Sequence, residues 1–164
     1  MADSLNMSLG SEGLSLIQDF ETFQAKLYDT DGGGHCTVGW GHLVHKGNCD
    51  GRENEKAFLS GVSREEADRI LGQDTGVAEK AVNEKVAARK ATLTQNQFDA
   101  LVSFTYNVGT GNLETVLIGC TGDDGVLDLT KVPAKMKLYE KSSGKILAGL
   151  TRRRNREATL FEKK

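Results

Sequence analysis

The chain has 164 residues, of which 38% are hydrophobic and 27% are charged, and its formal net charge at pH 7 is −2. A chain of this length can form one domain, or two small lobes that share a long element, and can bury a core without disulfides or metals. The nearly balanced charge gives no electrostatic case for a nucleic-acid partner.

The N-terminal residues 1–6 (MADSLN) have neither the basic region nor the apolar region of a signal peptide. Nowhere does the sequence approach the ~20 consecutive apolar residues that a membrane-spanning helix needs. We therefore expect a protein that is made in the cytoplasm and does not insert into membranes.

The first predicted element is a helix from Ser11 to Phe23. Leu14, Ile17 and Phe20 recur at helical spacing, and Ser11 is a suitable N-cap residue. This helix would carry an acidic residue, Glu21, close to its C-terminal end.

A glycine-rich turn with a second acid, Asp31, follows this helix. Three consecutive glycines, Gly32 to Gly34, allow a tight turn with positive φ, and a strand-like run extends from Cys36 to Trp40. Hydrolysis of a glycosidic bond needs one protonated carboxyl group and a second group that activates water or stabilises the transition state. Glu21 and Asp31 could supply both, although two acids beside a glycine turn are also consistent with solvated surface charges.

The three cysteines, Cys36, Cys49 and Cys120, form an odd count. Zinc binding is not expected, because no two cysteines lie two to four residues apart and the histidines lack zinc-finger spacing. Buried thiols are the default interpretation. A disulfide between Cys36 and Cys49 is the alternative if the chain reaches an oxidising compartment.

A second turn-rich stretch after the strand is expected to complete a small sheet, and residues from Asn48 to Gly61 are expected to form a loop. Ser63 and Glu66 then form a capping box. It opens a helix predicted over about 64–89, whose apolar residues recur on one side. A helix of about 25 residues is ~37 Å long, more than a small lobe needs. We therefore expect it to join a sheet lobe to a helical lobe.

Thr94 and Gln97 form a weaker capping box for the next helix, which the glycines Gly109 and Gly111 are expected to stop. The stretch 119–128 is predicted as a surface turn. Its Asp-Asp-Gly sequence hints at calcium, but the remainder of an EF-hand loop is missing, so we predict no metal there.

Two short segments complete the chain. Pro133 suits the first turn of a short helix that reaches Tyr139, and residues 142–145 are expected to be a connector. A final helix is predicted from about Gly149 to Phe161 and carries a basic run, 152–156 (RRRNR).

The sequence from Thr37 to His42, Thr-Val-Gly-Trp-Gly-His, closely resembles the Thr-Ile-Gly-Tyr-Gly-His motif of the phage-type lysozymes. This resemblance implies that Glu21 is the catalytic acid and Thr37 the catalytic threonine. The catalytic aspartate of the family stands six residues before the threonine, which selects Asp31. Counting forward from Tyr28 in the family's Tyr-x-Asp pattern lands on Thr30 instead, which indicates one extra residue in this chain, and Asp29 is the competing candidate.

Two further blocks resemble the same family. Residues 100–109 resemble its Ala-Leu-x-Ser-Phe-x-Phe-Asn-x-Gly signature, with Asn107 and Gly109 matching, and residues 149–157 resemble Gly-Leu-x-x-Arg-Arg-x-x-Glu. The resemblance implies that His42, Asn107, Gly109 and Arg153 contact the substrate, with Arg153 approaching the catalytic acid. For Asn107, a helix C-cap is an equally good interpretation.

The resemblance implies a single lysozyme-like α+β domain over 1–164. It would consist of a sheet lobe (about 21–62), a linking helix (about 64–89) and a helical lobe (about 92–164 with the N-terminal helix). The expected function is that of a monomeric muramidase that lyses bacterial cells. It would cleave the β-1,4 bond between N-acetylmuramic acid and N-acetylglucosamine in peptidoglycan with inversion, without metal or cofactor.

Such an enzyme would reach the cell wall in the periplasm through a holin or a secretion apparatus. The rival interpretations are a lytic transglycosylase, which needs one acid only, and a wall-binding module with a degenerate site.

Overall fold

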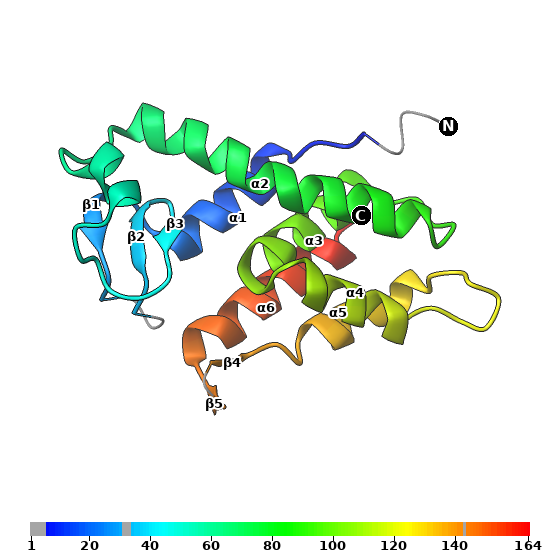
Figure 1. Cartoon of the computed structure of the whole chain (residues 1–164). Helices are drawn as coiled ribbons and strands as arrows, with labels where there is room; N and C mark the ends of the chain where they lie inside the picture. Colours follow the sequence, from blue (N-terminus) through cyan, green and yellow to red (C-terminus); the bar gives the residue numbers. More distant parts are fainter. Residues whose placement is uncertain (1–5, 31–33, 143) are drawn as a thin grey trace. The chain divides into compact units, whose positions relative to one another are not determined.

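The computed structural model describes residues 6–30, 34–142 and 144–164. The chain divides into two compact units (Figure 1). The sheet unit is Gln18–Asp74, and the helical unit combines Met1–Ile17 with Thr75–Lys164. Two helices, α1 (Ser11–Glu21) and α2 (Arg64–Ala87), continue from one unit into the other.

The sheet unit contains an antiparallel sheet of order β1-β2-β3. Its strands are β1 (Gln24–Tyr28), β2 (Cys36–Gly39) and β3 (His42–His45). Helix α1 ends two residues earlier than predicted, because Thr22 has a φ of 51° and turns the chain out of the helix into β1.

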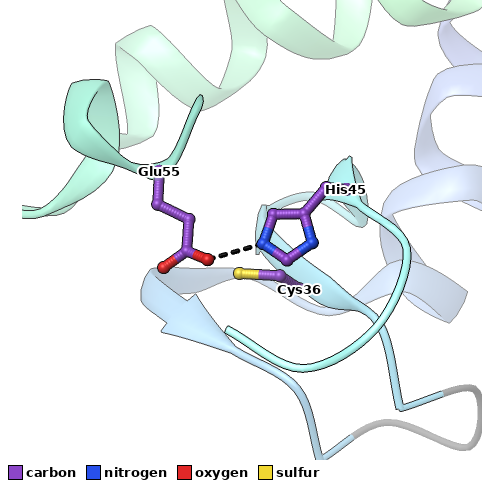
Figure 2. Close-up of side chains that lie close together, drawn as sticks. All are labelled: Cys36, His45 and Glu55. Atoms are coloured by element: carbon purple, nitrogen blue, oxygen red, sulfur yellow. Dashed lines mark hydrogen bonds and ion pairs between the residues drawn. The ribbon is translucent and has the colours of Figure 1, made fainter. Parts of the chain in front are cut away.

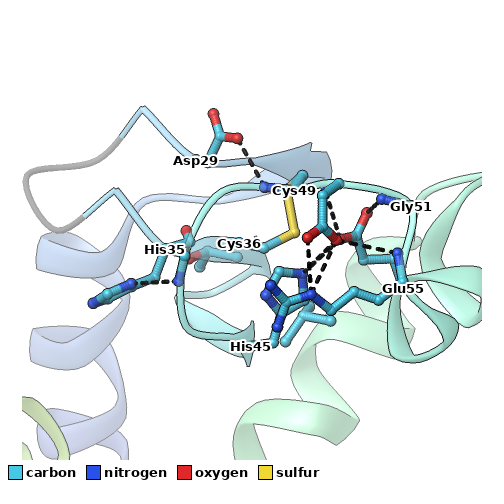
Figure 3. The surroundings of a disulfide bond; sticks show 12 residues. Asp29, His35, Cys36, His45, Cys49, Gly51 and Glu55 are labelled. Carbon is cyan, nitrogen blue, oxygen red and sulfur yellow. Dashed lines mark hydrogen bonds and ion pairs between the residues drawn. A yellow bond between two sulfur atoms is a disulfide. The ribbon is translucent and has the colours of Figure 1, made fainter.

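A disulfide between Cys36 and Cys49 ties β2 to the segment after β3, so the oxidised alternative is the one observed (Figure 3). This segment is more ordered than the predicted loop, because it contains the 3₁₀ helix η2 (Glu53–Phe58). The buried Glu55 carboxylate explains the order. It accepts hydrogen bonds from the backbone N–H groups of Asp50 at 2.8 Å and Gly51 at 3.1 Å.

The helical unit is built from α3 (Gln95–Val108), α4 (Thr110–Gly119), α5 (Val132–Met136) and α6 (Ala148–Glu162). Helix α3 packs against α6 and α4. Their buried side chains form the core together with α5, and include Phe98, Leu101, Phe104, Leu113, Leu117, Met136 and Phe161. The single-turn element η3 (Leu129–Lys131) leads into α5.

Three details of this unit differ from the sequence prediction. Helix α5 ends at Met136 and does not reach Tyr139. The chain resumes helical structure at Thr110 because Gly109, with a φ of 91°, changes the direction of the chain at one residue only. The expected connector is a small hairpin of β4 (Lys141–Ser142) and β5 (Lys145–Ile146). None of the described helices is long and apolar enough to cross a membrane.

Candidate active site

A pocket of about 470 Å³ lies within the sheet unit, and Glu21 and Thr37 both line it. Its described lining residues are Phe20, Glu21, Thr22, Gln24, Tyr28, Thr30, His35, Thr37, Gly41 and Leu43. The end of α1, the sheet and the β2–β3 turn all contribute to it. The structure therefore brings together two of the three predicted catalytic residues.

The carboxylate of Glu21 lies against the backbone of the β2–β3 turn. Gly41 in this turn has a φ of 78°, and a Cβ added there would overlap Oε1 of Glu21. Glycine is therefore required at this position for two reasons: the backbone conformation has a positive φ, and the Glu21 carboxylate occupies the space of a Cβ atom.

This close approach gives a testable prediction. Gly41→Ala should displace the Glu21 carboxylate and lower lytic activity on the order of 10²-fold, the usual cost of misplacing a catalytic group by about 1 Å. Gly51→Ala is the matched control, since Gly51 also has a positive φ, 86°, but a Cβ added to it would meet nothing within 4 Å. Both variants should lose about 1–2 kcal/mol of unfolding free energy. Equal activity of the two variants in a turbidity assay would contradict the placement of Glu21.

The hydroxyl group of Thr37 is held in a defined orientation. Thr37 lies in β2, is 5% exposed, and donates a hydrogen bond of 2.8 Å from Oγ1 to the carbonyl oxygen of His35. Because a hydroxyl has one proton, Thr37 can offer a bound water only its acceptor lone pairs. A water at this hydroxyl would therefore donate one proton to Thr37 and keep its other proton for a base.

The third predicted catalytic residue, Asp31, lies outside the described residues. Asp29 is described, and its Oδ2 accepts a hydrogen bond of 2.9 Å from the backbone N–H of Cys49 (Figure 3). It is not among the described residues that line the pocket. The carboxylate of Asp29 thus anchors the segment after β3.

Two pocket residues, Tyr28 and His35, were not predicted from the sequence as site residues. His35 Nδ1 accepts a hydrogen bond of 2.9 Å from the backbone N–H of Gly47, which leaves Nε2 as the protonated nitrogen of the neutral ring. His35 lies just before β2, whose pairing with β3 is irregular between Cys36 and Thr37, so strand periodicity did not indicate it.

The other predicted substrate contacts have structural partners. His42 Nδ1 is 2.8 Å from Oδ2 of Asp74, and its ring packs on Phe58. In the helical unit, Oδ1 of Asn107 accepts a hydrogen bond of 2.9 Å from Arg154. The C-cap interpretation of Asn107 is wrong, because α3 continues through Val108 and its C-cap is Gly109.

Arg153 is buried in the helical unit and lies beside Arg154, which is also buried. The guanidinium of Arg153 donates to the carbonyl oxygen of Ser103 at 3.2 Å and to the Glu157 carboxylate at 3.2 Å. The Ser103 hydroxyl donates a shorter bond of 2.6 Å to the same carboxylate. These bonds fix α6 to α3, and the predicted role of Arg153 beside the catalytic acid stays a prediction.

A second group of polar side chains in the sheet unit surrounds the disulfide. His45 and Glu55 are both buried, and Nε2 of His45 is 2.5 Å from Oε2 of Glu55 (Figure 2). The Lys46 carbonyl, and then Glu55, raise the pKa of His45 above its usual 6.5. The hydrogen bond from His45 and those from the backbone lower the pKa of Glu55 to about 2. Both shifts favour the charged pair, the protonated His45 ring beside the Glu55 carboxylate.

These two shifts predict a pH window of stability. The contribution of the raised His45 pKa is fully present below 6.5 and is lost as the pH rises through the raised value. The contribution of the lowered Glu55 pKa is fully present above 4.5 and is lost as the pH falls toward about 2. The free energy of unfolding in urea should thus differ most between wild type and His45→Gln in the window from pH 4.5 to pH 6.5. A difference that is constant with pH, or that grows at alkaline pH, would contradict the charged pair.

Known proteins are similar to this chain in sequence and in fold. A family model described as phage lysozyme matches residues 18–157. An endolysin of Bacillus phage PZA is 33% identical over 156 residues, which are 94% of this chain and 55% of that protein. The chain therefore spans about half the length of this relative.

Solved structures of related proteins have a similar fold. The muramidase domain of SpmX from Asticaccaulis excentricus has a TM-score of 0.73 and 29% identity, over 97% of this chain and all of that one. An endolysin from Escherichia coli O157:H7 phage FAHEc1 also has a TM-score of 0.73, with 28% identity over 96% of this chain and 94% of that chain. Because the family model matches most of the chain, including Glu21 and Thr37, the protein belongs to the phage lysozyme family and has its α+β fold.

Proposed function

We propose that the protein is a muramidase that hydrolyses the β-1,4 bond between N-acetylmuramic acid and N-acetylglucosamine in peptidoglycan. The observation that carries the proposal is the pocket of the sheet unit, in which Glu21 and an oriented Thr37 hydroxyl occur together. Membership of the phage lysozyme family supports the choice of substrate.

In the proposed mechanism, protonated Glu21 donates its proton to the glycosidic oxygen as the bond breaks. Asp31 accepts a proton from a water molecule that also donates a hydrogen bond to Thr37. The hydrogen bond from Thr37 to His35 supports this assignment, because it leaves the threonine oxygen as an acceptor for the water. Attack by this water on the face opposite the leaving group inverts the anomeric carbon.

The family resemblance also assigns substrate contacts to His42, Asn107, Gly109 and Arg153, and these assignments are part of the proposal. We propose further that the protein acts as a monomer and reaches the cell wall through a holin or a secretion apparatus. The similarity to endolysins of phages supports this route.

Mass spectrometry of peptidoglycan fragments digested in ¹⁸O-labelled water tests the reaction. Hydrolysis should give fragments with reducing N-acetylmuramic acid that carry one labelled oxygen for each bond cleaved. Unlabelled anhydro products would instead identify a lytic transglycosylase, and binding to walls without fragments would identify a wall-binding module. NMR of the initial product anomer tests inversion, and the retained anomer would contradict the proposed roles of Asp31 and Thr37.

A further inference from the structure

The group of side chains around the disulfide has the composition of a metal site. Sγ of Cys36, a ring nitrogen of His45 and a carboxylate oxygen of Glu55 all lie within 4.8 Å of one another, and all three residues are buried (Figure 2). Cys49 adds a second sulfur, because it is bonded to Cys36 (Figure 3). We propose that the chain with this disulfide reduced binds one Zn²⁺ ion through Cys36, His45, Cys49 and Glu55.

The spacing of these atoms suits a tetrahedral ion. Zinc binds thiolate sulfur at ~2.3 Å and imidazole nitrogen or carboxylate oxygen at ~2.0–2.2 Å, so its ligand atoms stand roughly 3.5 Å apart. The ligand atoms of Cys36, His45 and Glu55 already lie within 4.8 Å of one another. To hold the ion, Nε2 of His45 and Oε2 of Glu55, now 2.5 Å apart, and the two sulfurs, now bonded, would have to move apart. Two thiolates, one imidazole and one carboxylate are ligands that zinc accepts.

The two cysteines are held in place by more than their disulfide. The backbone N–H of Cys36 donates to the carbonyl oxygen of Gly47 at 2.8 Å, and that of Cys49 donates to the Asp29 carboxylate at 2.9 Å. The two Cα atoms are 4.8 Å apart. Because these backbone bonds do not involve sulfur, reduction should leave both thiols facing the same space.

The remaining two ligands already have the outer hydrogen bonds that metal ligands use. Nδ1 of His45 is 2.8 Å from the carbonyl oxygen of Lys46, so the ring is oriented with Nε2 toward Glu55. Metal-binding histidines are oriented in this way, with the second nitrogen donating to a carbonyl or carboxylate. The Glu55 carboxylate is held by the backbone N–H groups of Asp50 and Gly51.

Zinc can bind to the two sulfurs only after the disulfide is reduced. A phosphine reductant cleaves the Cys36–Cys49 bond and gives two thiols, and the phosphine is oxidised to its oxide with oxygen from water. Zn²⁺ then displaces one proton from each thiol, and His45 binds as the neutral ring through Nε2, giving up the proton on that nitrogen where it carries one. In the reduced chain the ion would replace the disulfide between β2 and the segment after β3, and would add links to β3 through His45 and to η2 through Glu55.

Cobalt provides a direct test, because Co²⁺ bound to thiolates in a tetrahedral site absorbs in the near ultraviolet and the visible range. Protein should be reduced with a phosphine, desalted without oxygen and titrated with Co²⁺ and then Zn²⁺. We expect one Co²⁺ per chain with thiolate bands, displacement of Co²⁺ by Zn²⁺, and no such bands from the oxidised protein. Absence of thiolate bands from the reduced chain, folded or unfolded, would overturn the proposal.

Substitutions separate this site from adventitious thiol binding. His45→Gln and Glu55→Gln keep side-chain size and polarity and should each weaken Zn²⁺ binding by at least about tenfold, the lower limit for loss of even an outer-shell partner. Cys120→Ser removes the remaining thiol, and His42→Gln breaks the other histidine–carboxylate pair. Both should bind Zn²⁺ like wild type. Equal affinity of all four variants would overturn the proposal, whether or not the protein is a muramidase.

Discussion

Glu21→Gln should abolish lysis, with a loss of about 10²–10⁴-fold, the usual contribution of a general acid. The amide has nearly the same shape as the carboxylic acid but has no proton that it can transfer to the glycosidic oxygen. Glu21 lines the pocket of the sheet unit, directly against the turn that contains Gly41. Clearing of isolated cell walls at several enzyme concentrations measures the effect.

Glu53→Gln is the matched control for this experiment. Glu53 belongs to the same unit, but its side chain is 86% exposed in η2 and pairs only with Lys56 among the interactions described. This variant should keep wild-type activity. Circular dichroism and thermal unfolding should show that both variants are folded, and more than a few per cent of residual activity in Glu21→Gln would refute the assignment.

Capping boxes in the sequence predicted the starts of α2 and α3 well, whereas Ser11, the expected N-cap of the first helix, is the first residue of α1. The Ser63 hydroxyl accepts the N–H of Glu66 at 3.1 Å, and helix α2 begins at Arg64 as the capping box indicates. Thr94 and Gln97 likewise form both bonds of a capping box at the start of α3. Such signals are reliable because they involve residues only three apart.

Helix α4 was missed because its start has no side-chain cap. The N-cap residue of α4 is Gly109, which has no side chain that could cap the helix. In the sequence, Gly109 and Gly111 therefore indicate only the end of α3. The buried residues Leu113, Val116 and Leu117 have helical spacing within α4. Their periodicity was the signal that could have predicted this helix.

The motif from Thr37 to His42 identified part of the pocket, but no motif indicated the group around the disulfide. Cys36 and His45 come together because they are register partners in the antiparallel pairing of β2 with β3. Glu55 joins them from η2 through its bond to His45. Spacing along the chain does not reveal such a group, because strand register brings Cys36 to His45 and the segment between β3 and η2 brings Glu55 to both.

The last prediction concerns the second carboxylate of the active site. Asp31→Asn should lose nearly all activity, about 10²-fold or more, because an amide cannot accept the proton of the attacking water. Asp29→Asn should keep most activity, because its side-chain oxygen can still accept the N–H of Cys49 that Asp29 binds at 2.9 Å. Each substitution removes one negative charge, and the two positions are only two residues apart, so each variant is the electrostatic control for the other.

The pair of variants also separates the reaction types. A lytic transglycosylase needs only its acid, so full activity of Asp31→Asn together with loss in Glu21→Gln would favour that reaction and remove the proposed base. Loss of activity in Asp29→Asn alone would transfer the role of base to Asp29. That result would require the Asp29 carboxylate to leave Cys49 and approach Thr37. A crystal structure of the enzyme with bound substrate fragments would show whether it does, because an inverting pair of carboxyl groups stands ~6.5–9.5 Å apart with one water between them.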